Sequence, residues 1–118
     1  MSIALRQSYL TSNNGVASVS TTISVVAGDL IVVARYNQNG LDATSTCNDG
    51  TNTYTKQTGG NFTNVGCSID FFYTIATATN ASLSVTTNSP GGNTGDTSQV
   101  IHVVSGIARA GGVVEVTY

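Results

Sequence analysis

The chain has 118 residues, a formal net charge of −2 and a charged fraction of only 8%. This length suits one domain with a real core and excludes two domains of ordinary size, so we expect residues 1–118 to form a single domain. The four basic residues are scattered and form no stripe that could neutralise phosphates, which argues against a nucleic-acid partner. No apolar run approaches membrane-spanning length, and the N-terminus lacks an export signal, so we expect neither membrane insertion nor Sec export.

The first part of the chain contains two predicted strands joined by a turn. Ser2 to Thr11 alternates loosely between apolar and polar residues, which predicts a peripheral edge strand with mixed faces. Ser12 to Gly15 contains Asn-Gly and predicts a type I′ hairpin turn. In the next strand Val19, Ile23 and Val25 alternate with hydroxylic residues, so we expect one dry face and one wet face.

The stretch Ile23 to Tyr36 is the predicted centre of the fold. Its two apolar runs are rich in β-branched residues and are broken once by Ala27-Gly28-Asp29, which predicts strand, tight turn, strand. The second run, Leu30 to Ala34, does not alternate with polar residues. We therefore expect this strand to lie in the middle of a sheet with both of its faces covered.

The middle of the chain predicts another hairpin and the longest strand. Asp49-Gly50 followed by a threonine-rich stretch to Lys56 predicts a hairpin with a return strand. Val65 to Ala76 predicts a long strand, and period-two counting places five of its residues on the inward face. These residues are Cys67, Ile69, Phe71, Tyr73 and Ile75.

The last third of the chain predicts three further strands. Ala81, Leu83 and Val85 should face inward, while Ser98 to Ser105 is apolar at its centre and should be covered on both faces. Gly112 to Tyr118 is the last strand candidate. Eight or nine short strands with Gly, Asn and Asp turns predict an all-β antiparallel sandwich of the jelly-roll kind, with an immunoglobulin-like sandwich as the alternative.

The sequence offers no clear catalytic constellation, so we expect neither an enzyme nor a cofactor. His102 is the only histidine, and its apolar neighbours in the chain predict a packed or hydrogen-bonded core residue. No Gly-x-Ser-x-Gly elbow is present, and the carboxylates are spread singly. Asp49 with Asn48 and Asn52 favours an Asx turn, with a calcium loop as the less favoured alternative.

Aromatic and sulfur side chains leave two alternatives open. Tyr36, Tyr54 and Phe62 lie near predicted turns, where they either pack over the ends of the sandwich or serve as platforms for a sugar. Cys47 and Cys67 permit one disulfide but do not require it, and free thiols are the alternative. With no CxxC pair and no nearby histidine, we expect no metal site at these cysteines.

Four short motifs follow one another in a characteristic order: Val25 to Val33, Asn48 to Tyr54, Phe71 to Tyr73 and Val103 to Gly106. The order resembles that of a loose group of β-sandwich modules in bacterial surface proteins and tailed-phage virion proteins. In that group a Gly-Asp-Leu turn opens a central strand, an Asp-x-x-Gly/Asn-x-Tyr/Trp hairpin follows, and a Tyr-Ser-Gly-like ending closes a late strand. Here Val104 stands in place of the usual aromatic residue. The resemblance implies a non-catalytic structural or binding module.

Within this group a free-standing, charge-poor sandwich fits a virion component better than a part of a long exported chain. We therefore expect a decoration or cement protein, made in the host cytoplasm and placed on the capsid surface of a phage. Its partners would be the major capsid protein or another virion protein, and further copies of itself in a homo-oligomer such as a trimer. The alternative is a carbohydrate-binding or adhesin module that recognises a surface glycan.

In a sandwich without pocket chemistry we expect the contact surface at edges and loops. The candidates are the N-terminal segment, the Pro-Gly-Gly loop and the C-terminal strand, although the terminal strands could instead pair inside the fold. The residues assigned to this contact surface are Ser2, Ile3, Leu5, Ser89, Pro90, Gly91, Gly92 and Tyr118.

Overall fold

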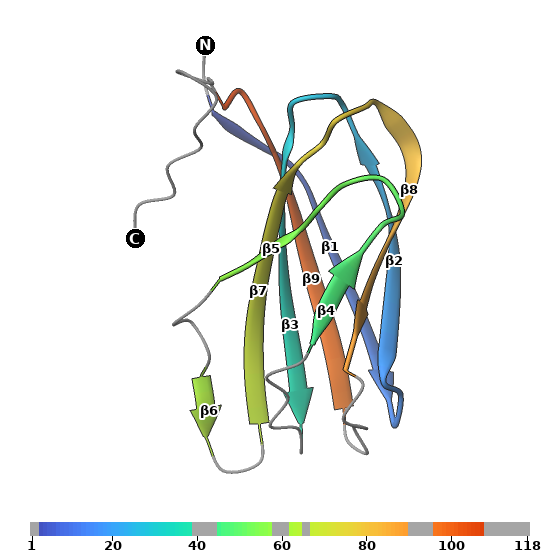
Figure 1. Ribbon diagram of the computed structural model, residues 1–118, viewed down its shortest axis with the longest axis vertical. Helices are drawn as coiled ribbons and strands as arrows, with labels where there is room; N and C mark the ends of the chain where they lie inside the picture. Colours follow the sequence, from blue (N-terminus) through green and yellow to red (C-terminus); the bar gives the residue numbers. More distant parts are fainter. Residues whose placement is uncertain (1–2, 39–44, 58–61, 65–66, 90–95, 108–118) are drawn as a thin grey trace.

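The computed structural model describes residues 3–38, 45–57, 62–64, 67–89 and 96–107, and nine strands lie within these ranges (Figure 1). The strands are β1 Ala4–Asn14, β2 Ser18–Val25, β3 Leu30–Gln38, β4 Thr46–Asn48, β5 Thr55–Lys56, β6 Phe62–Asn64, β7 Cys67–Ile75, β8 Asn80–Asn88 and β9 Asp96–Ser105. In these ranges no helix is long and apolar enough to cross a membrane. The predicted strand at Gly112 to Tyr118 lies outside the described residues.

The strands form two antiparallel sheets that pack face to face (Figure 1). In the larger sheet the order is β1-β9-β3-β7-β5, and β6 also pairs with β7; the smaller sheet has the order β2-β8-β4. The pairing is nested, because β1 pairs with β9, β2 with β8 and β3 with β7. This nested arrangement over two sheets is the jelly-roll pattern, so the predicted all-β sandwich is confirmed in its jelly-roll form.

Two turns that predicted hairpins instead carry the chain from one sheet to the other. The turn at Gly15 joins β1 to β2, and the turn at Asp49-Gly50 lies between β4 and β5; each pair of strands belongs to different sheets. The turns themselves are where the sequence predicts them, since Gly15 and Gly50 have φ angles of 70° and 77°. The hairpin predictions are wrong because a turn residue determines only the local direction of the backbone. It does not determine which sheet the next strand joins.

The space between the sheets has an apolar half and a polar half. The apolar half contains Ile23, Val25, Ile31, Val33, Phe72, Ala76, Leu83, Val85, Ile101 and Val103. The predicted inward faces of β2 and β8 are thus confirmed, except that Ala81 is exposed. The polar half contains Arg35, Asn37, Ser68, Asp70, Thr87, Thr97 and Gln99, all nearly inaccessible to solvent.

Hydrogen bonds between the sheets accompany this polar burial. Gln99 of β9 donates from Nε2 to Thr21 Oγ1 at 2.9 Å and to the carbonyl of Val85 at 3.1 Å, and it accepts from Thr87 Oγ1 at 2.6 Å. Asp70 accepts from Ser45 Oγ at 2.5 Å. Because buried polar groups are costly without partners, these bonds make the polar half compatible with the fold.

Strand β3 lies between β9 and β7 in the middle of the larger sheet, as the sequence predicts. Ile31 and Val33 point into the core and are 0% exposed. Val32 and Ala34 point to the opposite face and are only half-buried, as are His102, Val100 and Val104 of β9. Leu30 lies on the same face but is only 8% exposed. The prediction that both faces of β3 and β9 are covered therefore holds at Leu30 and is wrong at Val32, Ala34, Val100 and Val104.

Strand β7 has the reverse orientation from the predicted one. Asp70, Phe72 and Thr74 point into the core, whereas Phe71 is 39% exposed on the other face. The inward assignment of Cys67, Ile69, Phe71, Tyr73 and Ile75 is wrong. Hydrophobicity favoured the wrong face, because that face carries Ile69, Phe71 and Ile75. The face that points inward instead carries Asp70, which lies in the polar half of the core with Ser45 and Lys56 as partners.

Truncation of the central strand tests the assignment of the core. We expect Ile31→Ala or Val33→Ala to lower the free energy of unfolding by about 2 to 4 kcal/mol, because each removes buried methyl groups. Leu10→Ala is the control in the same sheet, since Leu10 is 70% exposed, and its effect should stay within about 0.5 kcal/mol. Urea unfolding measures all three, and equal effects at Leu10 and Ile31 would contradict the assignment.

Candidate interaction surfaces

The face of the larger sheet that points away from the smaller sheet is apolar across four strands, and it is termed the outer face. The registers of β1, β9, β3 and β7 place its residues in four rows. The rows are Leu5–Val104–Leu30–Ile75, Ser8–His102–Val32–Tyr73, Leu10–Val100–Ala34–Phe71 and Ser12–Ser98–Tyr36–Ile69.

The outer face carries no Asp, Glu, Lys or Arg in these rows. Leu5, Leu10 and Phe71 are 60%, 70% and 39% exposed. With strands about 4.8 Å apart and successive rows about 6.7 Å apart, the rows span on the order of 300 Å² of sheet. That size is comparable to the largest apolar patch of a typical monomer, which often marks an interaction site.

His102 lies near the centre of the outer face, between Ser8 and Val32. It is half-buried, and its Nδ1 atom is inaccessible to solvent and makes no hydrogen bond to the described residues. The prediction of a core histidine is therefore wrong in its placement. The histidine belongs to the apolar surface, where its ring contributes contact area.

Three of the eight residues assigned to the contact surface lie within the described ranges. Ile3 is 71% exposed, and Leu5 belongs to the outer face. Ser89 is only 1% exposed and its N–H donates to the carbonyl of Ala17 at 2.9 Å, so its assignment to the contact surface is wrong. Ser2, Pro90, Gly91, Gly92 and Tyr118 lie outside the described residues. Leu10 lies within the predicted N-terminal contact segment, Met1 to Leu10, and is 70% exposed on the outer face. The sequence reasoning missed Phe71, and the available signal was the lack of polar alternation in the neighbouring strand β3.

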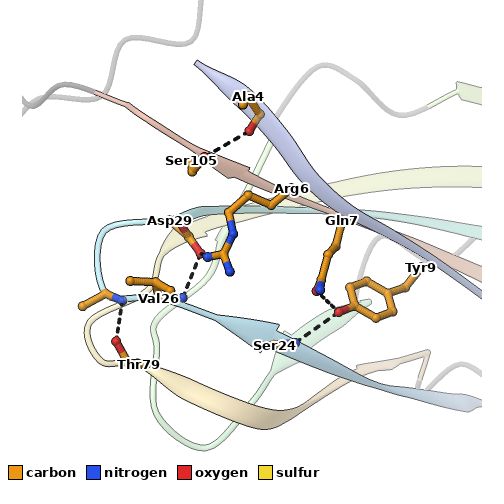
Figure 2. Close-up of polar contacts among 10 residues, drawn as sticks. Ala4, Arg6, Gln7, Tyr9, Ser24, Val26, Asp29, Thr79 and Ser105 are labelled. Carbon is orange, nitrogen blue, oxygen red and sulfur yellow. Dashed lines mark hydrogen bonds and ion pairs between the residues drawn. The ribbon is translucent and has the colours of Figure 1, made fainter. Parts of the chain in front are cut away.

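Asp29 ties the edge strand β1 to the turn between β2 and β3, and this contact is termed the Arg6–Asp29 clasp (Figure 2). The N–H of Asp29 donates to the carbonyl of Val26 at 3.0 Å, and Gly28 has a φ angle of 95°, as the third position of a type II turn requires. Asp29 Oδ2 accepts from the Val26 N–H at 2.8 Å and from Arg6 Nη1 at 2.5 Å. The Gly-Asp-Leu motif thus has a structural role.

Further contacts hold β1 in place, because most of its side chains are exposed. The Tyr9 hydroxyl donates to Gln7 Oε1 and accepts from the N–H of Ser24 at 3.2 Å, as Figure 2 shows. Thr21 Oγ1 of β2 donates to Thr11 Oγ1 at 2.8 Å. These bonds and the clasp fix the register of β1, and with it the positions of its two leucines on the outer face.

The carboxylate of Asp49 is surrounded by donors of its own turn. Oδ1 accepts from the N–H groups of Thr51 and Asn52 at 2.8 and 2.7 Å, and Oδ2 accepts from Asn52 Nδ2 and the Tyr54 hydroxyl at 2.8 and 2.9 Å. Burial opposes ionisation, but these hydrogen bonds outweigh it and hold the pKa of Asp49 below its ordinary value. The Asx-turn interpretation is confirmed. In the described part of the chain, no three His, Cys, Asp or Glu side chains gather as metal ligands.

Two of the three aromatic residues predicted as possible sugar platforms, Tyr54 and Tyr36, are half-buried and are not exposed rings. Tyr54 is half-buried and packs against the apolar core. Burial, together with the neighbouring charge of Asp49, raises its pKa. Tyr36 lies within the outer face, and the side chain of Phe62 is outside the described set.

Both cysteines are free thiols. Cys47 of β4 packs against the core between the sheets, and burial, with the charge of Asp49, raises its pKa to about 12. Cys67 lies at the start of β7 on the side of the larger sheet that faces away from the core. The larger sheet therefore lies between the two thiols.

Substitutions at Asp29 and Arg6 should separate the stability that comes from the Val26 hydrogen bond from the stability that comes from the Arg6 ion pair. Asp29→Ala removes the acceptor of a backbone N–H and of Arg6, so we expect a loss of about 2 to 3 kcal/mol in the free energy of unfolding. Arg6→Ala removes only a partly exposed ion pair and should cost no more than about 1 kcal/mol. Asp29→Asn keeps an acceptor for the Val26 N–H, so its loss in the free energy of unfolding should be similar to that of Arg6→Ala. Urea unfolding measures the three losses; equal losses for Asp29→Ala and Asp29→Asn would contradict this account.

The Asp49 turn should show a pH-dependent contribution. The pKa of Asp49 in the folded protein is lowered from 3.8. The contribution of its carboxylate to the free energy of unfolding is therefore fully present above pH 3.8, and it is lost as the pH falls through the lower pKa of the folded state. We expect Asp49→Asn to be less stable than the parent by about 1 to 2 kcal/mol at neutral pH. The difference should shrink towards about pH 2. Chemical unfolding over this range measures it, and a difference that does not change with pH would refute the assignment.

No family model matches the sequence, and no curated protein or solved structure matches it either. The resemblance to surface and virion modules therefore stays an expectation that rests on its four motifs.

Proposed function

We propose that this protein is a non-catalytic structural protein that attaches to other protein subunits through its outer face, as a decoration or cement protein does on a phage head. The observation that carries the proposal is the uncharged apolar surface across β1, β9, β3 and β7. Protein interfaces have apolar centres that are poor in charge and rich in aromatic residues. The outer face has this composition, with Phe71, Tyr73 and Tyr36 among its residues.

The shape of the surface suits attachment to a shell. A sheet face presents a broad area with regular rows, and the clasp keeps its edge strand in register. Weak contacts made by many copies add up when those copies are linked in an oligomer or held on a repeating lattice. The partners in this proposal are a shell subunit and further copies of the chain, and the protein would be located on the surface of a virion.

The low charge of the protein supports association between identical copies. A net charge of −2 gives little electrostatic repulsion between them. In the outer-face rows the only basic side chain is that of His102. Copies that approach through this face therefore bury few groups that would be costly to desolvate.

Charge placed on the outer face tests the proposal. Leu10→Asp and Phe71→Asp each introduce a carboxylate into the apolar rows, so we expect at least tenfold weaker self-association and weaker sedimentation with undecorated phage shells. Thr22→Asp is the control, because Thr22 is exposed on β2 in the other sheet. Analytical ultracentrifugation measures the mass, and circular dichroism checks the fold of each variant. A parent that stays monomeric and never sediments with shells would contradict the proposal.

A further inference from the structure

A second surface, on the opposite side of the sandwich from the outer face, is lined by Ser, Thr, Asn, Asp and Gly among the described residues. It is a hollow of about 580 Å³ over the smaller sheet, and it is termed the polar hollow. The residues that matter for its chemistry are Ser18, Thr46, Asn48, Asp49, Ser84 and Asn88. They come from β2, β4, β8 and the turn after β4, so three strands and one turn build the surface.

The lining of the polar hollow suits an uncharged ligand. Among the described residues no Lys or Arg lines it, which argues against an anionic ligand. The one acidic residue in the described lining is Asp49, whose carboxylate already accepts four hydrogen bonds from its own turn. The described lining also contains no Val, Leu, Ile or aromatic side chain, so an apolar ligand would find little to pack against. A ligand that carries many hydroxyl groups and no charge fits this lining.

Two asparagine side chains offer their amide hydrogens to such a ligand. Asn48 Oδ1 accepts from the N–H of Gly50 at 2.7 Å, and Asn88 Oδ1 accepts from Ser18 Oγ at 2.8 Å. Each oxygen is thereby engaged within the protein, which orients each NH₂ group. Neither NH₂ group makes a hydrogen bond to the described residues, and each has two hydrogens to donate.

The register fixes the spacing of these donors. Thr46 pairs with Asn88 and Asn48 pairs with Thr86, so Asn48 and Asn88 are diagonal neighbours on adjacent strands. Side chains in this relation lie about 7 to 8 Å apart. The hydroxyls of Thr46 and Ser84 line the same hollow and act as both donors and acceptors. Two donors in this relation can contact different hydroxyl groups of one ligand.

We propose that the polar hollow binds a neutral saccharide, with Asn48 and Asn88 donating to its oxygens and with Thr46 and Ser84 exchanging hydrogen bonds with its hydroxyls. The site lies over β2, β8 and β4, whereas the outer face belongs to the larger sheet. A saccharide can therefore be bound while the outer face is occupied. This inference does not depend on attachment to a shell.

Asparagine-to-aspartate variants test the donors without removing the internal bonds. Asn48→Asp and Asn88→Asp keep the oxygen that accepts from Gly50 or Ser18, but they replace the NH₂ donor with a second acceptor. The probe is a printed array of neutral oligosaccharides, followed by calorimetric titration of the best-bound compound into the full-length chain. We expect saturable binding by the parent and at least tenfold weaker binding by each variant. Thr46→Val tests the same hollow without added charge and should also weaken binding.

The controls separate this site from the outer face. Leu10→Asp adds the same charge to the larger sheet, away from the hollow, and should leave the dissociation constant within twofold of that of the parent, even where the variant fails to self-associate. Thermal melting confirms the fold of every variant. The proposal is overturned if the parent binds no neutral saccharide on the array, or if the Asn48→Asp/Asn88→Asp double variant binds as the parent does.

Discussion

A single buried carboxylate, that of Asp29, connects the parts of the fold on which the outer face depends. Its side chain accepts from Arg6 of β1 and from the backbone of Val26 after β2, while its backbone carbonyl accepts from the N–H of Ala76 after β7. Asp29 is only 4% exposed, so its bonds form where water competes little. Strand β1 buries few side chains and gains much of its position from this contact and from its ladder with β9.

The sequence predicted the strands and turns better than their arrangement. Gly15, Gly28 and Gly50 mark real turns, because positive φ angles are a local property that a single residue determines. Sheet membership is not local: β2 finds its partner in β8, about sixty residues later in the chain. The sandwich class followed from strand number and turn spacing, whereas the nested pairing required knowledge of distant partners.

The candidate surfaces were less predictable than the fold, for reasons that particular residues show. Hydrophobicity favoured Phe71 over Phe72, because the neighbours of Phe71 on its face of the strand are also apolar. Phe72 faces the core together with Asp70, whose buried carboxylate has Ser45 and Lys56 as partners. A buried carboxylate in a core strand is not an expected pattern. The polar hollow draws on β2, β4 and β8, and only the folded structure brings Asn48 and Asn88 to adjacent strands.

The nested pairing also determines the order in which this chain can fold during synthesis. Ala4 and Ser105 lie side by side in the larger sheet although they are 101 residues apart in the chain. At a synthesis rate of roughly 5 to 20 residues per second, β1 waits on the order of 5 to 20 seconds for its partner to be made. Strand β3 waits for β9 as well, so the core residues of both strands stay without a complete sheet until β9 has been made. The larger sheet of this jelly roll therefore closes only after its last described strand has been translated.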